Sequence, residues 1–170
     1  CTAVGVQALE NATSGYNDAF GVYSLNSNTS GHRNVAFGYG SLRFSQTGQS
    51  NVGVGHNSGG SLTTGSNNVF IGKNAQPSAN NAINQIVIGE GATGIGNNYA
   101  VIGNSSITDV YMAQEGKAKV YCGGLNIGDM TYPTSDGTVN QVLQTNGVGT
   151  LDWATVSSGA SNINELSDCL

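Results

Sequence analysis

Two histidines, His32 and His56, come nearest to a catalytic set, because the chain also has many serines and a few aspartates. A Ser-His-Asp hydrolase uses such residues as nucleophile, base and orienting acid. No GxSxG elbow or comparable local signature accompanies either histidine. His32 lies in an expected turn, and His56 fills a repeat position that is occupied elsewhere by Val6, Val22, Tyr39, Lys73, Glu90 and Asn104. We interpret both as solvent-facing turn residues, expect no catalytic residue, and predict that the chain is not an enzyme.

Phosphate and metal sites have their own signatures, and the sequence predicts neither. The glycine pairs in residues 53–55 and 94–96 lack the strand–GxGxxG–helix context of a phosphate loop. Cys1, Cys122 and Cys169 form no CxxC pair and no His/Cys cluster, so a zinc site is not expected. We therefore expect no cofactor and no metal.

Three N-x-[ST] sequons begin at Asn11, Asn28 and Asn104. In a chain this rich in Asn, Ser and Thr such matches arise from composition alone, so glycosylation stays open.

The charge of the chain is low and unevenly placed. Charged residues make up 9% of the sequence and the net charge is −5. Residues 1–107 balance three basic against three acidic side chains, and the remainder holds two lysines against seven acids. Neither part has the basic stripe that phosphate backbones require, so nucleic acid is not an expected partner. No apolar run is long enough for membrane insertion in this segment, and its residues predict no signal peptide within it.

A small group of aromatic and basic residues is the candidate for surface binding. Aromatic faces beside polar groups suit carbohydrate or protein surfaces. The alternative is that these residues cap turns and pack between neighbouring chains. The group is Tyr16, Tyr23, Tyr39, Arg43 and Phe44.

An internal repeat organises the first hundred residues. A short β-prone triplet that ends in Gly recurs with spacings of 16, 17, 17, 17, 17 and 14 residues. The closing glycines are Gly5, Gly21, Gly38, Gly55, Gly72, Gly89 and Gly103. We expect them to supply turns, because glycine tolerates left-handed backbone conformations.

Further columns keep the same register. An asparagine stands four residues before the Gly, and we interpret this column as turn residues: Asn17, Asn34, Asn51 and Asn68. A strand-forming residue immediately precedes the Gly, and we expect it to point into a core: Val4, Phe20, Phe37, Val54, Ile71, Ile88 and Ile102. The residue before that points to the opposite face of the strand. Both faces are therefore expected to be buried, one inside a coil and one against another chain.

One repeat of about 17 residues can form two short strands and two turns, and stacked repeats form an all-β solenoid. Such a thin coil has open ends and little core of its own, which favours association with copies of itself.

The pattern Asn-x-[Val/Ala]-[Ala/Val]-[Phe/Ile/Val]-Gly-x-x-[Ala/Ser] resembles the head repeat of YadA-like trimeric autotransporter adhesins. It is still more similar to the longer NxAVGxxALxxxTTG repeats of bacteriophage tail fibres and related surface proteins. Residues 34–42 and 2–9 match best, and the resemblance covers residues 1–107. It implies a left-handed parallel β-roll, built as an intertwined homotrimer that works in attachment. The outer turns here are longer than those of the adhesin repeat.

The period ends after Gly103. Residues 108–130 are expected to form a β neck, with Val110, Met112, Val120 and Leu125 as core candidates. Residues 131–156 are expected to form a hairpin module, because residues 141–145 and 148–154 flank the turn pair Asn146 and Gly147. This module resembles the DGTxGQVLxTxGxGxLxW segment of phage tail-fibre proteins, which places Trp153 in a small trimer core.

Residues 157–170 start with a Ser/Gly linker and then begin a further module. Cys1 occupies the column where Asn stands in later repeats, so the N-terminus is interpreted as a cut. Cys122 and Cys169 are interpreted as buried thiols near a trimer axis, with disulfides as the alternative.

These patterns favour a homotrimeric fibre segment on the outside of a virion, a phage tail-fibre-type shaft that displays or positions receptor-binding parts. The receptor would be a host-surface glycan or protein. One alternative is the head of a cellular trimeric adhesin at a cell surface, and another is a purely structural extracellular filament.

Overall fold

The computed structural model describes residues 1–112, 126–127, 130–131, 133, 135–148 and 150–155. Within these residues every regular element is a β-strand, and none is a helix. Contacts divide the chain into two compact units, Cys1–Val110 and Tyr111–Leu170. The first unit contains the repeat, and the second contains the segment expected to form a hairpin.

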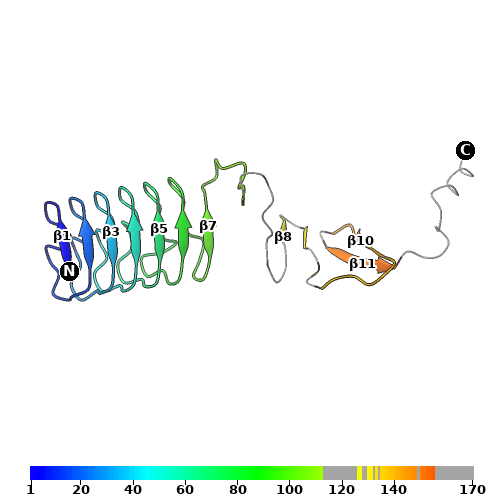
Figure 1. Ribbon diagram of the computed structural model, residues 1–170, viewed down its shortest axis with the longest axis horizontal. Helices are drawn as coiled ribbons and strands as arrows, with labels where there is room; N and C mark the ends of the chain where they lie inside the picture. The colour runs from blue at the N-terminus through cyan, green and yellow to red at the C-terminus, as the bar shows by residue number, and fades with distance from the viewer. Residues whose placement is uncertain (113–125, 128–129, 132, 134, 149, 156–170) are drawn as a thin grey trace, which may run out of the picture. The chain divides into compact units, whose positions relative to one another are not determined.

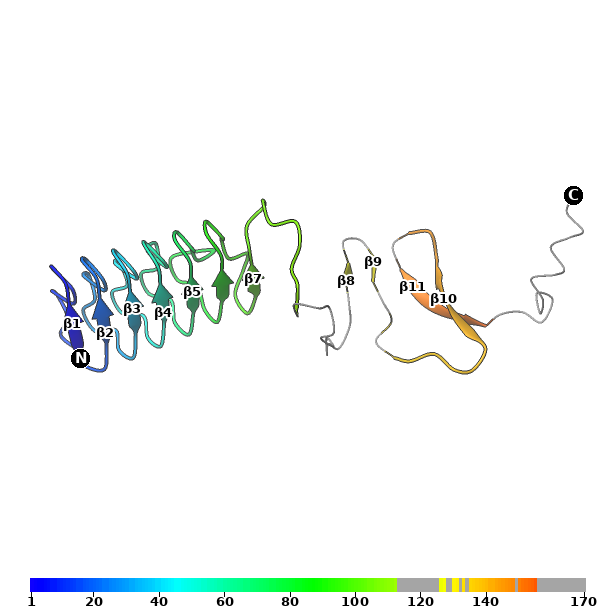
Figure 2. The same cartoon turned by 45° about the horizontal axis from the view of Figure 1, so that its top comes forward.

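The first unit is a parallel β-solenoid of about six turns, which confirms the fold class predicted from the repeat. Seven strands form one sheet in chain order, side by side in both views (Figures 1 and 2). Successive strands pair in register, so that Ala36 lies opposite Ala19 and Gly53. The strands are β1 (Thr2–Val4), β2 (Asp18–Phe20), β3 (Val35–Phe37), β4 (Val52–Val54), β5 (Val69–Ile71), β6 (Ile86–Ile88) and β7 (Ala100–Ile102).

Each coil contains one strand, and the expectation of two strands per repeat is wrong. Outside the sheet, neighbouring coils are joined by separate backbone hydrogen bonds, such as Leu25 N to Ser41 O at 3.0 Å and Gln46 N to Thr63 O at 2.7 Å. Leu25 and Leu42 have φ values of 48° and 49°, which are left-handed and interrupt an extended conformation. The second side of the coil therefore stacks without forming continuous strands.

The strand residues that face the coil interior are the middle ones. Ala19, Ala36, Phe70 and Val87 have no exposed surface. The column expected to point into a core lies instead on the outer face of the sheet. Its members are half-buried or exposed: Val4, Phe20, Phe37, Val54, Ile71, Ile88 and Ile102.

The small size of the interior explains this orientation. A β-carbon added at Gly53 would lie only 2.9 Å from Leu42 Cγ. In the next coil the large and the small residue change places. The inward residue of β5 is the large Phe70, and Gly59 stands at the position that Leu42 holds one coil earlier. A β-carbon at Gly59 would lie 2.7 Å from both Leu42 Cδ2 and Phe70 Cδ2. The interior is close-packed. The middle strand position and the position four residues after the repeat glycine share its volume, so in these coils a large residue at one goes with a small residue at the other.

The asparagine column, at the end of the turn that precedes each strand, forms a buried ladder inside the coils. Asn17, Asn34, Asn51 and Asn68 are fully buried. Asn34 Nδ2 donates to Gly48 O at 2.8 Å, and Asn34 Oδ1 accepts from the backbone N of Asn51 at 2.9 Å. The left-handed residues of this turn are those just before the asparagines, with φ of 58–64°: Tyr16, Arg33, Ser50 and Asn67.

The glycine that closes each strand lets neighbouring coils approach each other. Gly5, Gly21, Gly38, Gly55, Gly72 and Gly89 have φ between 130° and 135°, where L side chains are strained, and Gly103 has 91°. A β-carbon at Gly38 would lie 2.7 Å from the carbonyl carbon of Gly55 in the next coil. The glycine column is therefore required by close backbone contact as well as by conformation.

The described residues of the second unit form two antiparallel pairs. The strands β8 (Asn126–Ile127) and β9 (Met130–Thr131) form the first, and β10 (Gln141–Thr145) and β11 (Leu151–Thr155) form the expected hairpin. The second hairpin strand begins at Leu151, not at residue 148, because Asn146 Oδ1 accepts from the backbone N of Val148 at 2.9 Å and of Thr150 at 3.1 Å. This side chain organises a longer loop than a two-residue turn.

Several expectations concern the region around the hairpin. Trp153 is half-buried, pairs with Leu143 and donates from Nε1 to Ser135 O at 2.8 Å. Val110 and Met112 are exposed in this chain, in contrast to the core positions expected for them. Val120, Leu125, Cys122, Cys169 and residues 157–170 lie outside the described residues.

Candidate binding surface of the outer turns

The two histidines lie in separate environments. His56 is exposed and stacks on Tyr39, with ring centroids 5.2 Å apart and an angle of 8° between the planes. His32 is half-buried. Within the described residues, no hydrogen bond joins either imidazole to a serine or an aspartate. The residues from which a catalytic triad would be assembled are thus not brought together here.

The other chemical candidates of the sequence have structural environments. Asn28 is fully buried, so its sequon is inaccessible to a glycosylating enzyme, whereas Asn11 is exposed and donates to Asn26 O at 2.8 Å. Asn104 Nδ2 donates to Glu90 O at 2.6 Å. Cys1 Sγ accepts from the backbone N of Asn17 at 3.5 Å, where later coils use an asparagine oxygen. Among the described residues, no group of His, Cys, Asp and Glu side chains is arranged to hold a metal ion.

Four of the five candidate surface residues lie together on the turns that follow β2 and β3. The Arg43 guanidinium lies over the ring of Tyr23, 4.4 Å from its centroid, and 5.2 Å from that of Phe44. Tyr39 contacts Tyr23 edge-on, with 5.8 Å between centroids. We call Tyr23, Tyr39, Arg43, Phe44 and His56 the aromatic cluster. Tyr16, in contrast, precedes the asparagine column and has no aromatic contact among the described residues.

His56 belongs to this cluster, although the sequence pattern indicates only a turn residue. It stands one period of 17 residues after Tyr39, so the two rings are placed in adjacent coils by the repeat itself. Column-by-column comparison of aromatic positions therefore predicts the stack.

A hollow of about 450 Å³ adjoins the cluster and opens to solvent. Its walls are Phe44, Asn57, Gly60, Ser61, Asn74 and Gln76. We call it the outer-turn hollow.

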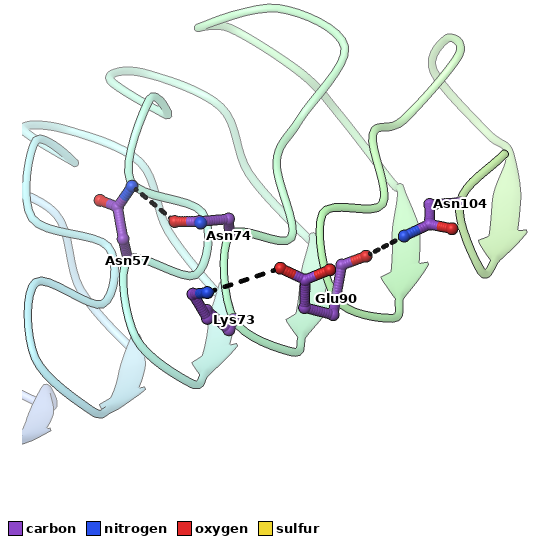
Figure 3. Close-up of polar contacts among 5 residues, drawn as sticks. All are labelled: Asn57, Lys73, Asn74, Glu90 and Asn104. Atoms are coloured by element: carbon purple, nitrogen blue, oxygen red, sulfur yellow. Dashed lines mark hydrogen bonds and ion pairs between the residues drawn. The ribbon is translucent and has the colours of Figure 1, made fainter. Parts of the chain in front are cut away.

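The polar walls of the outer-turn hollow are connected to each other. Gln76 Oε1 accepts from the backbone N and the Oγ of Ser61 at 3.0 and 2.9 Å, and Gln76 Nε2 donates to Asn57 O at 2.6 Å. Asn57 Nδ2 donates to Asn74 Oδ1 across adjacent coils at 3.3 Å (Figure 3).

The polar walls were not predicted, although their columns are visible in the sequence. Asn57 and Asn74 stand two residues after the repeat glycines and have φ of 53° and 56°. Asparagine tolerates this left-handed conformation better than most residues, so the turn itself selects it. Beside Asn74 the turn surface is charged, with Lys73 Nζ 3.7 Å from Glu90 Oε1 of the next coil (Figure 3). Both side chains of this pair are exposed, so it contributes little stability.

The outer face of the sheet is a second distinct surface. It carries the column from Val4 to Ile102, together with Val35 and Ile86, which are also exposed. Phe37 exposes 58% of its surface and Ile102 56%, although strand residues of this type are usually covered. Phe20 and Phe37 contact each other with centroids 5.7 Å apart. We call this surface the apolar sheet face.

In the part of the chain that the structure describes, no helix is long and apolar enough to cross a membrane. Comparison with protein-family models, with curated proteins and with solved structures finds no match to this chain.

Proposed function

We propose that the chain is a segment of a homotrimeric attachment fibre, a shaft of the phage tail-fibre type that displays or positions receptor-binding parts outside a virion. The observation that carries this proposal is the apolar sheet face, which runs along all seven strands. Exposed apolar patches of this length on a soluble chain mark surfaces that contact another macromolecule.

The repeat supports copies of the same chain as the partner. The face presents at least one large apolar side chain per strand, and strands in a sheet are spaced about 4.8 Å apart. A partner that covers such a face along its length needs matching apolar groups at the same spacing. A second coil stack of the same sequence has this spacing.

A threefold arrangement is favoured by the form of the face and by the resemblance to trimeric repeats. Each strand has only three residues, so the face is a narrow ridge. Three such ridges can meet around one axis and enclose their apolar side chains, with the turns left outside. Cyclic symmetry of this kind also keeps the three chains parallel, as a fibre requires.

The native mass tests the assembly. We expect light scattering to give three times the chain mass of 17.3 kDa, and we expect this mass to persist after heating in mild detergent. A mass equal to one chain, or to two, would contradict the trimer.

A pair of substitutions locates the interface. Phe37→Asp places a charge on the apolar sheet face and should reduce the particle to single chains, because a buried unpaired charge costs several kcal/mol, on the order of 3–5. Phe44→Asp makes the same change at an exposed phenylalanine on a turn. The particle of this variant should keep a mass of three chains. Equal masses for the two variants would show that the sheet face is not the contact.

The head of a cellular trimeric adhesin is the second candidate. The aromatic cluster favours it, since aromatic side chains with a polar neighbour suit a surface that contacts a receptor directly. Antibodies against the chain distinguish the two proposals: labelling of virions supports the tail fibre, and labelling of cell surfaces in the absence of virions supports the adhesin.

A further inference from the structure

We propose that the outer-turn hollow binds a neutral sugar residue. This gives the segment a ligand site of its own, which goes beyond positioning other receptor-binding parts and does not depend on the trimer. The size of the hollow, its one aromatic wall, its free amide groups and the absence of ionisable residues from its walls all favour such a ligand.

The size of the hollow suits one sugar ring. Its volume of about 450 Å³ lies within the range of small-ligand sites, roughly 300–1,000 Å³. Because it opens to solvent, the rest of an oligosaccharide can extend from it along the turns.

Phe44 supplies a stacking wall. The residue is 46% exposed and lines the hollow. The face of an aromatic ring carries negative potential and attracts the partly positive C–H groups of a pyranose. Arg43 lies over one face of this ring, since its guanidinium is 5.2 Å from the Phe44 centroid and 4.4 Å from that of Tyr23. The wall is therefore ordered before a ligand arrives, which reduces the entropy lost on binding.

The amides supply both kinds of hydrogen-bonding group that a hydroxyl needs. The bond from Asn57 Nδ2 to Asn74 Oδ1 fixes both side chains (Figure 3). Among the described residues, it leaves Asn57 Oδ1 without a donor and Asn74 Nδ2 without an acceptor. Ser61 Oγ donates to Gln76 Oε1 and keeps its lone pairs for a further donor. A sugar hydroxyl both donates and accepts, so these groups match it.

Charge separates neutral sugars from acidic ones. None of the residues that line the hollow is ionisable. Two cations adjoin these walls: the Arg43 guanidinium lies over the rings of Tyr23 and Phe44, and Lys73, next to Asn74, is paired with Glu90. Residues 1–107, which contain the hollow, balance three basic against three acidic side chains, so the coil stack has no net charge that would attract an anionic glycan.

Saturation-transfer NMR on the full chain tests the site. The probes are lactose, maltotriose and diacetylchitobiose as neutral sugars, and sialyllactose as an acidic one. We expect saturation transfer to at least one neutral probe and a measurable dissociation constant. The absence of transfer to all three neutral probes, or transfer to sialyllactose alone, would overturn the proposal.

Matched variants place the bound sugar in the hollow. Phe44→Ala removes the stacking wall, and Asn74→Gly removes an amide while it keeps the left-handed backbone at φ 56°. Each should weaken binding at least about tenfold. Two control variants lie outside the hollow. Asn67→Gly makes the same change at φ 62°, and Tyr99→Ala removes an exposed ring. The dissociation constant of both should stay within about twofold of the wild-type value.

Circular dichroism of each variant checks that the coils still form. If Phe44→Ala does not fold, the pair Asn74→Gly and Asn67→Gly decides the question. Equal weakening by these two changes would show that the sugar binds elsewhere and would overturn the assignment.

Discussion

Each repeat glycine has two separate reasons to be glycine, one conformational and one steric. At Gly38 the backbone has φ 131°, and the space for a side chain is filled by the carbonyl group of Gly55 in the next coil. Gly15 also belongs to a glycine column of the repeat, but a β-carbon there would have no neighbour within 4 Å. Regular recurrence in the sequence therefore does not by itself show how strongly a position needs glycine.

This contrast gives the first stability prediction. Gly38→Ala should lower the free energy of unfolding by about 2–4 kcal/mol, because strain at the backbone and a clash with the next coil both act. The backbone at Gly15 has a negative φ, and an added methyl group would enter open space. Gly15→Ala should therefore change the free energy of unfolding by less than about 0.5 kcal/mol. Urea unfolding followed by circular dichroism measures both, and equal losses would contradict the steric explanation.

In the asparagine ladder, each side chain provides the hydrogen-bond acceptor for the asparagine of the next coil. Asn34 Oδ1 accepts from both the backbone N and the Nδ2 of Asn51, at 2.9 and 3.1 Å. The side chain of Asn34 also supplies the donor that Gly48 O uses. These groups are buried, so none of them can turn to water instead.

Asn34→Ala should therefore destabilise the coils by about 1–3 kcal/mol for each buried group left without a partner. Asn81→Ala is the control, since Asn81 is exposed and makes no side-chain hydrogen bond among the described residues. The midpoint of urea unfolding should fall clearly for the first variant and stay near that of the wild type for the second. A similar fall in both would show that the ladder is not a main source of stability.

At the scale of elements, the repeat predicts the sheet well and its two faces poorly. The spacing of glycines places all seven strands, because the triplet before each Gly becomes a strand. Alternation separates Ala36 from Phe37 but does not say which one faces inward. Size and hydrophobicity point to Phe37, yet Leu42 and Asn34 already fill the interior, so the small residue is the buried one.

The hairpin shows a similar limit. Asn146 and Gly147 correctly predict the reversal of the chain. The length of the loop depends on the side chain of Asn146, which accepts from the backbone of Val148 and Thr150. Turn propensities describe the backbone of a dipeptide and do not include such side-chain bonds.

The coil is the unit that stacks, so a whole coil can be removed. Deletion of residues 35–51 joins Asn34 to Val52 and preserves every column of the repeat. Stability in such arrays is nearly a sum of repeat and nearest-neighbour terms, so the melting temperature should fall by no more than about 10 °C. Thermal unfolding by circular dichroism measures it.

The control deletion, residues 35–42, joins Asn34 to Arg43 and breaks the register. It removes a strand and places polar turn residues at interior positions, so it should abolish the cooperative transition. If both deletions melted alike, the coil would not be the structural unit.

At the scale of the whole molecule, the repeat separates two surfaces with different properties. The apolar sheet face consists of strand residues, and the aromatic cluster and outer-turn hollow consist of turn residues. The last residue of every strand, from Val4 to Ile102, is a large apolar one in all seven strands, whereas the turn column changes from Tyr39 and His56 to Lys73 and Glu90. Assembly and ligand binding can therefore vary independently.

The sequence predicts these two surfaces to different extents. The aromatic residues of the cluster could be identified because aromatic side chains are rare here, at 7% of the chain. The hollow could not, because its walls are Asn, Gly, Ser and Gln, which the turns use throughout. Only the stacking of adjacent coils shows which of these common residues enclose a space.

The parallel stacking of the coils also has a mechanical consequence. The hydrogen bonds between coils lie along the stacking direction, both in the sheet and in the asparagine ladder. A pull between the first and last coils therefore loads the inter-coil contacts in series, and the weakest contact yields first. Each coil that detaches releases about 17 residues, or roughly 50–55 Å of extended chain beyond its own layer. Under tension the segment behaves as an extensible tether that lengthens in steps and dissipates the load before the chain itself is strained.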